Sequence, residues 1–213
     1  MLKGITFGNV HSYKDLKLIL TSKEIGSPAV KTNKVDIPGA DSALDLTDFF
    51  GEPKYEDVTH KFEFTTIEPQ SDFLTQYSSI KNAIHGKKVR IILDDDPTFF
   101  YWGRCFVSGF TNEKGIGTVS VECECEPYKY KLAATVVTQA VAGTKVITLT
   151  NSRKRAVPTI TTTAAMTIAF GNGSWANGAG TFTIPELELM EGNNTVTVSG
   201  TGTITFTWNE GGL

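Results

Sequence analysis

Alternation of apolar and polar residues is the feature that most constrains the fold of this chain. Phe62 and Phe64 alternate with Lys61 and Glu63, and residues 14–22 show the same period of two. This period is typical of antiparallel strands that bury one face and expose the other. Similar stretches recur along the 213 residues, so we expect a mainly β fold.

One segment has helical spacing instead. Phe73, Tyr77, Ile80 and Ile84 recur at intervals of four, three and four residues, which places them on one face of a helix. We therefore predict a single α-helix within residues 71–86. The residues suited to cap its two ends are Ser71 or Asp72 and Gly86.

Charged residues are distributed unevenly along the chain. Residues 1–132 hold 35 of the 43 charged residues, whereas residues 133–213 hold 18 of the 29 threonines. Such an abrupt shift in composition is typical of a domain boundary. We predict a first domain of strands with one helix over 1–132, and a small β-sandwich domain over 133–213.

The last part of the second domain resembles a hairpin. We expect Val196 and Val198 to pair with Ile204, Phe206 and Trp208 across a Gly-Thr-Gly turn at 200–202. Threonines occupy the opposite face of both strands, where a branched polar side chain suits a solvated sheet surface.

The sequence contains no motif of a common catalytic site. It has no Gly-x-Ser-x-Gly elbow, no P-loop, no dinucleotide-binding glycine pattern and no His-Glu-x-x-His. We therefore predict no enzyme activity, no catalytic residue, no metal site and no cofactor. The histidines interpreted as structural are His11, His60 and His85; the cysteines interpreted as reduced and buried are Cys105, Cys123 and Cys125.

Three polar or aromatic features each allow two interpretations. Residues 94–96 are three aspartates that can hold a hard cation, but the following Pro97 favours an ordinary turn. The basic run 153–155 is either a solvated loop or a docking contact. Trp175 lies in a Gly/Asn-rich loop, where it either stacks on a sugar or packs at the edge of the sandwich.

Net charge and hydropathy limit the partners of the chain. The net charge is −3, which does not favour sequence-specific nucleic-acid binding. No apolar run approaches the roughly 18–20 residues that span a bilayer, so we expect no membrane insertion. The N-terminal residues lack an apolar core and a cleavage site of the kind that export signals carry.

The order of motifs in residues 1–132 resembles the distal tail protein family of siphophages and prophages. The most specific parts are Pro-Gly-x-Asp at 38–41, Leu-Asp-Leu-Thr at 44–47 and TFFYWGRCFVSGF at 98–110. The family often has glycine after the aspartate of the first motif, whereas this chain has Ser42.

This resemblance implies a structural virion protein. It implies a tail-tube-like N-terminal β-sandwich with one helix and a galectin-like C-terminal β-sandwich. Six copies are expected to form a ring at the tail tip of the virion, after synthesis in the host cytoplasm. The ring would join the tail tube protein to a tail-associated lysin, baseplate hub or receptor-binding protein. The alternatives are a carbohydrate-binding adhesion module acting through the second domain, and a tail-tube or terminator subunit.

Residues 35–51, VDIPGADSALDLTDFFG, are interpreted as an arm that reaches an adjacent subunit. A Pro-Gly turn precedes alternating leucines and aspartates, so one side of the segment is apolar. Apolar residues that leave their own sheet must be buried elsewhere, and a neighbouring subunit is one such place. The residues predicted to form this arm are Pro38, Gly39, Asp41, Leu44, Leu46, Phe49 and Phe50.

Overall fold

A computed structural model describes residues 3–49, 51–66, 73–113 and 116–213. The chain divides into two compact units, one of Met1–Lys129 with Leu213 and the other of Tyr130–Gly212. The predicted fold class, mainly β with one helix among the described residues, is confirmed.

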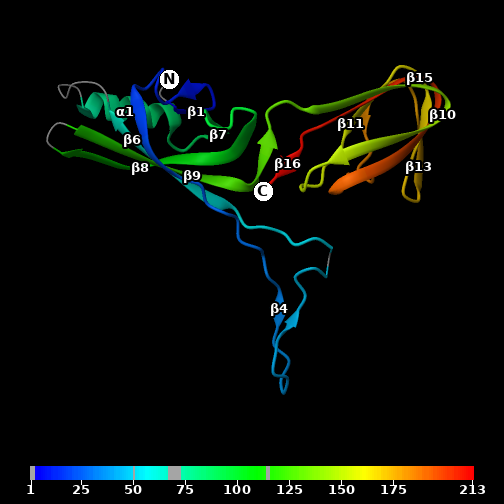
Figure 1. The fold of residues 1–213 in the computed structure, drawn as a ribbon, viewed down its shortest axis with the longest axis horizontal. Helices are drawn as coiled ribbons and strands as arrows, with labels where there is room; N and C mark the ends of the chain where they lie inside the picture. Colours follow the sequence, from blue (N-terminus) through cyan, green and yellow to red (C-terminus); the bar gives the residue numbers. More distant parts are fainter. Residues whose placement is uncertain (1–2, 50, 67–72, 114–115) are drawn as a thin grey trace. The chain divides into compact units, whose positions relative to one another are not determined.

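The first unit is built around one strongly curved sheet (Figure 1). Its strands follow the order β2-β1-β7-β8-β9-β6-β3, and a separate pair, β4 and β5, lies in the connection between β3 and β6. The elements are β1 (Ile5–Phe7), β2 (Val10–His11), β3 (Leu18–Glu24), β4 (Lys34–Val35), β5 (Leu44–Asp45), β6 (Val58–Thr66), α1 (Phe73–Ile84), β7 (Lys88–Leu93), β8 (Phe99–Glu113) and β9 (Ile116–Lys131).

Contacts between distant strands show that this sheet closes around its own core. In the strand order, β1 and β6 are four steps apart, which is about 19 Å in a flat sheet at roughly 4.8 Å per step. The ring of Phe7 on β1 nevertheless lies 6.2 Å from that of Phe62 and 6.3 Å from that of Phe64, both on β6. The sheet therefore folds over on itself, as the layers of a sandwich do.

The helix α1 covers this core with the face that its spacing predicts. Ile80 and Ile84 are buried in the same cluster as Phe62 and Phe64, and the half-buried Tyr77 stacks on Phe110 with a centroid distance of 4.4 Å. The predicted cap residues Ser71 and Asp72, and the side chain of Phe73, lie outside the described residues.

Three cysteines line the same core. Cys105, Cys123 and Cys125 are buried and free, and the Cys123 thiol donates to the Cys105 sulfur at 3.1 Å. Burial raises the pKa of Cys125 to about 12, so its reactive thiolate is scarce at neutral pH. The prediction that these residues are reduced, buried apolar groups is confirmed.

The second unit consists of strands arranged in the order β13-β12-β15-β11-β14, and β10 also pairs with β15. Its buried side chains form a separate cluster that includes Val196, Val198, Ile204 and Phe206. The strands are β10 (Thr135–Asn151), β11 (Thr159–Thr162), β12 (Met166–Phe170), β13 (Gly173–Asn177), β14 (Gly180–Thr183), β15 (Gly192–Trp208) and β16 (Gly211–Gly212).

The hairpin predicted at residues 200–202 is wrong. Strand β15 runs through these residues and pairs with β10 along its whole length, from Gly192 opposite Asn151 to Trp208 opposite Thr135. On its other edge, one part of β15 pairs with β12 and a later part with β11.

The glycines serve close packing here and do not reverse the chain. A Cβ atom at Gly200 would lie 3.0 Å from the carbonyl oxygen of Ala165, and one at Gly202 would lie 2.8 Å from the Thr163 hydroxyl. Glycine therefore lets residues 163–166 pack directly on the strand.

Candidate functional site

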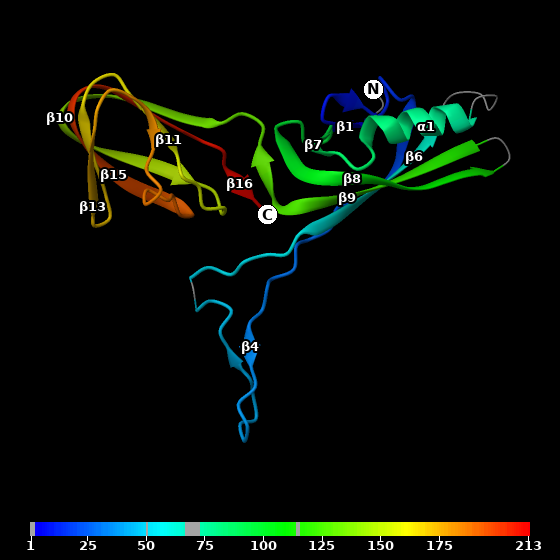
Figure 2. The ribbon, with the colours of Figure 1, turned by 180° about the vertical axis from the view of Figure 1, so that it is seen from behind.

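An exposed feature of the first unit is the connection from β3 to β6, described at residues 25–49 and 51–57. It contains the predicted arm of residues 35–51, and we call the whole connection the arm. Figures 1 and 2 show it leaving the sheet as a long, narrow hairpin. Its two sides are held by backbone pairing: Val35 lies opposite Leu44, and Lys31 donates to the carbonyl of Lys54 at 2.8 Å. The arm is therefore a two-stranded ribbon with an ordered backbone.

Pro38 and Gly39 lie in a tight turn at one end of this ribbon. The amide of Ala40 donates to the carbonyl of Ile37 at 3.1 Å, and Gly39 has a φ of +87°. A type II turn needs a positive φ at its third residue, which glycine adopts without strain, and proline suits its second residue. The dipeptide thus fixes where the ribbon reverses.

Polar side chains hold the second strand of the arm in place. The amide of Thr47 donates to the Asp45 carboxylate at 2.9 Å, and the Thr47 hydroxyl accepts from the amide of Asn33 at 3.1 Å. The side chain and amide of Thr47 also hold the pKa of Asp45 below its ordinary value. The Leu-Asp-Leu-Thr motif therefore orders the arm through hydrogen bonds, without a core of its own.

Apolar side chains on the arm face solvent. Leu44 is 48% exposed and Phe49 is 71% exposed, while Leu46 is half-buried. Phe50 lies outside the described residues. The other arm residues with large exposed apolar side chains are Ile25, Val30, Val35 and Ile37, and the exposed aspartates predicted on the arm are Asp41, Asp45 and Asp48.

The base of the arm is clamped to the sheet. The amide of Gly26 donates to Nδ1 of His60 on β6 at 3.2 Å. A Cβ atom at Gly26 would lie 2.7 Å from the carbonyl oxygen of Thr59, so only glycine allows this close approach. On the returning side, the ring of Tyr55 meets that of Tyr128 edge-on at 5.9 Å.

The three aspartates at 94–96 form a turn in which each carboxylate has a partner. Asp95 pairs with Lys3 and Lys23, and Asp96 pairs with Lys129 at 3.2 Å. In the described ranges, no group of three or more His, Cys, Asp or Glu could hold a metal ion.

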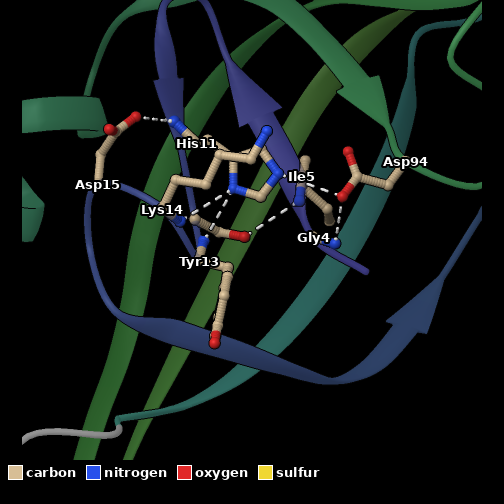
Figure 3. Close-up of polar contacts among 8 residues, drawn as sticks. Gly4, Ile5, His11, Tyr13, Lys14, Asp15 and Asp94 are labelled. Carbon is tan, nitrogen blue, oxygen red and sulfur yellow. Dashed lines mark hydrogen bonds and ion pairs between the residues drawn. The ribbon is translucent and has the colours of Figure 1, made fainter. Parts of the chain in front are cut away.

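Asp94 belongs to a network centred on the His11 side chain (Figure 3). Nδ1 of His11 accepts hydrogen bonds from the amides of Tyr13 and Lys14, both at 3.1 Å. The ring hydrogen therefore lies on Nε2, which donates to Asp94 at 3.2 Å; the same carboxylate oxygen accepts from the amide of Gly4 at 2.8 Å. The His11 ring thus ties the backbone at residues 13 and 14 to Asp94. Because both ring nitrogens already have structural partners, the arrangement does not resemble a catalytic site.

His85 is used in a similar way after α1. Its Nδ1 accepts from the amide of Val107 at 3.0 Å. The structure thus places the three histidines in separate hydrogen-bond networks, of which only that of His60 touches the arm.

In the second unit, Trp175 lies on strand β13 and not in a loop as the sequence suggested. It is half-buried against the core cluster, and its ring lies so close to Gly173 that a Cβ atom there would overlap it. In the basic run, Arg155 pairs with Glu188 at 3.1 Å and Lys154 bonds the hydroxyl of Tyr130. No described helix is long and apolar enough to cross a membrane.

No protein-family model matches the sequence, and no curated protein sequence matches it. Among solved structures, the crystal structure of the SPP1 Dit (gp 19.1) protein is similar, with a TM-score of 0.74 and 14% sequence identity. The match covers 100% of this chain and 100% of that chain. That protein is described as a paradigm of the hub adsorption apparatus in phages that infect Gram-positive bacteria. The resemblance seen in the sequence is thus confirmed for the fold: over its whole length, this chain has the fold of the phage protein SPP1 Dit.

Proposed function

We propose that this chain is a distal tail protein, a structural component of the tail tip of a siphophage or prophage virion. The observation that carries the proposal is an ordered arm with exposed apolar side chains, including Leu44 and Phe49, on a chain with the full-length fold of SPP1 Dit. Exposed apolar groups gathered on one protruding element are typical of an interaction surface.

In the proposed assembly, the arm of one copy contacts the next copy, and six copies close into a ring. A head-to-tail contact repeated around an axis forms a ring when its rotation divides a full turn. The ring would connect the tail tube protein on one face to a tail-associated lysin, baseplate hub or receptor-binding protein on the other. A net charge of −3 suits a channel for DNA, because phosphate-binding walls would retain the genome.

Negative-stain microscopy and native mass spectrometry of the purified chain test this proposal. We expect single closed rings with the mass of six subunits. Long filaments would indicate a tail-tube subunit instead. A monomer at tens of micromolar, with no ring in either measurement, would contradict the proposal.

The carbohydrate-binding alternative depended on Trp175. Because this side chain packs against the core of its own unit, its position gives that alternative no support beyond the sequence. The arm therefore favours the structural role.

A further inference from the structure

A cavity lies in the first unit at the base of the arm. Its volume is about 400 Å³, and its walls come from residues 25–28 at the start of the arm, from Val58 just after the arm, and from Pro127 and Leu213. The polar side chains that line it include His60, Tyr101 and Lys129. We call this cavity the arm-base pocket; it lies where the exposed Ile25 of the arm meets the core residue Val58.

His60 lines this pocket, and one nitrogen of its ring is buried without a partner. Its side chain is 1% exposed, and because Nδ1 accepts from Gly26, the ring hydrogen lies on Nε2. Nε2 is buried and finds no hydrogen-bond partner among the residues that the structure describes. An unmet buried donor costs about 1–3 kcal/mol, so a ligand whose acceptor reaches Nε2 after a small shift of the surrounding side chains would gain that energy.

The other polar groups of the pocket also favour an acceptor. Burial raises the pKa of Tyr101, which keeps its hydroxyl protonated. Nζ of Lys129 lies 3.2 Å from Oδ2 of Asp96 and over the ring of Phe99. These contacts hold the ammonium group in place but do not use all three of its hydrogens as donors. No Asp or Glu is among the described residues that line the pocket, which also include Leu213, the last residue of the sequence. The walls are otherwise largely apolar, so the preferred guest is a carboxylate next to apolar side chains.

The arm has this chemistry. Residues 34–51 contain four aspartates and one lysine, together with the exposed Leu44 and Phe49. We propose that the arm-base pocket of each subunit receives the acidic, apolar arm of a second copy, with an arm carboxylate accepting from Nε2 of His60 and facing Lys129. This inference rests on the proposed function, since it names the receiving site of the arm contact.

Such a contact links each arm to the next. The pocket is formed partly by the receiver's own residues 25–28, so a guest arm would brace the base of the arm that reaches onward. Each inserted arm would then order the arm that the receiving subunit inserts into the next copy. This coupling favours a closed ring over isolated dimers.

His60→Asn in the full chain separates the two roles of this side chain. The Asn amide oxygen can replace Nδ1 as the acceptor for Gly26, while nothing replaces the donor at Nε2. We expect subunit association in sedimentation experiments to weaken roughly 10- to 100-fold, measured at a temperature at which circular dichroism shows that the variant is folded, since the smaller side chain also lowers stability. His85→Asn is the matched control, because its histidine also accepts through Nδ1 but from Val107; its association should match the wild type.

A peptide experiment tests the pocket independently of ring formation. A synthetic peptide of residues 34–49 is titrated into the full-length Leu44→Asp, Leu46→Asp variant, whose own arm should not dock, and the His60 ring signals are followed by NMR. We expect saturable binding that shifts these signals and raises the pKa of His60, and at least tenfold weaker binding when His60→Asn is added.

The outcomes distinguish the pocket from the ring. If wild-type rings form but His60→Asn rings are equally stable and the peptide leaves His60 unaffected, the arm docks elsewhere: the pocket inference is wrong and the proposed function stands. If the wild type stays monomeric while the peptide binds at His60, the pocket stands and the ring is wrong. If neither rings nor peptide binding is seen, both are wrong.

Discussion

Glu210 shows how a single buried charge can organise the ends of several strands. It is 8% exposed and accepts hydrogen bonds from Lys131 at 2.8 Å, Ser152 at 2.6 Å and the Thr135 hydroxyl. Burial alone would raise the pKa of Glu210, but these hydrogen bonds outweigh it and hold the pKa below its ordinary value.

Replacing this carboxylate tests its contribution to stability. Glu210→Gln should lower the free energy of unfolding of the second unit by about 1–3 kcal/mol near pH 7, because it weakens charge-assisted hydrogen bonds. Since the folded pKa is lower than the unfolded one, ionisation stabilises the fold above the unfolded pKa, near 4.5, and this stability is lost as the pH falls through the folded pKa.

Urea unfolding at a series of pH values measures both effects. The difference between wild type and variant should be constant above pH about 4.5 and shrink in more acidic solution. Glu191→Gln changes an exposed carboxylate and is the control. A difference that stays constant down to pH 2 would mean that the Glu210 charge itself contributes little.

Replacing Gly26 tests the clamp at the base of the arm. In Gly26→Ala, the new Cβ atom would lie 2.7 Å from the Thr59 carbonyl and 2.8 Å from a Val58 methyl, so the arm must move away from β6. We expect the free energy of unfolding of the first unit to fall by about 1–3 kcal/mol, as is typical of overpacking, and the amide of residue 26 to exchange faster. Gly178→Ala, where a Cβ atom meets open space, should change neither. Unchanged exchange at residue 26 would disprove the clamp.

At the scale of elements, the arm is ordered by its backbone while its side chains remain exposed. Its turn was predictable because Pro-Gly favours one backbone geometry, which residues 37–40 adopt. Whether these side chains contact another subunit stays a prediction, since a single chain shows only that Leu44 and Phe49 are exposed on their own copy.

Two substitutions on the arm test this contact. Leu44→Asp combined with Leu46→Asp should abolish the ring, because charged groups cannot be buried in an apolar contact without a large desolvation penalty. Sedimentation velocity should show monomers, and circular dichroism should show a folded protein. Val136→Asp with Val146→Asp, at exposed positions on β10, is the matched control and should keep the ring. Persistence of rings in the arm variant would show that the arm does not hold the copies together.

Strand β15 marks the limit of local patterns. The period of two in residues 192–208 predicted strand structure correctly, but the glycines at 200 and 202 were interpreted as a hairpin turn. Glycine is needed at these two positions because residues 163–166 pack directly on the strand. No local pattern reveals a neighbour that lies about 35 residues earlier in the sequence. The helix α1 was easier to predict, since its apolar spacing lies within one continuous segment.

At the scale of the whole molecule, the fold was predictable although only 14% of residues match those of SPP1 Dit. A fold is specified largely by which positions are buried, and many sequences satisfy the same burial pattern. The arm-base pocket was not predictable in this way. His60 continues the buried face of Val58 and Phe62, so it looks like an ordinary core position, and the pocket forms only when residues as distant in sequence as 25 and 213 meet.

The full-length pairing of β10 with β15 affects how such chains can evolve. Thr135 lies directly opposite Trp208, so the polypeptide enters and leaves the second unit at adjacent points. A module whose two ends meet can be exchanged for another of different size or binding preference, while the rest of the chain needs no redesign. The second unit therefore has the connectivity of a module that can be replaced while the first unit, with its arm, stays unchanged.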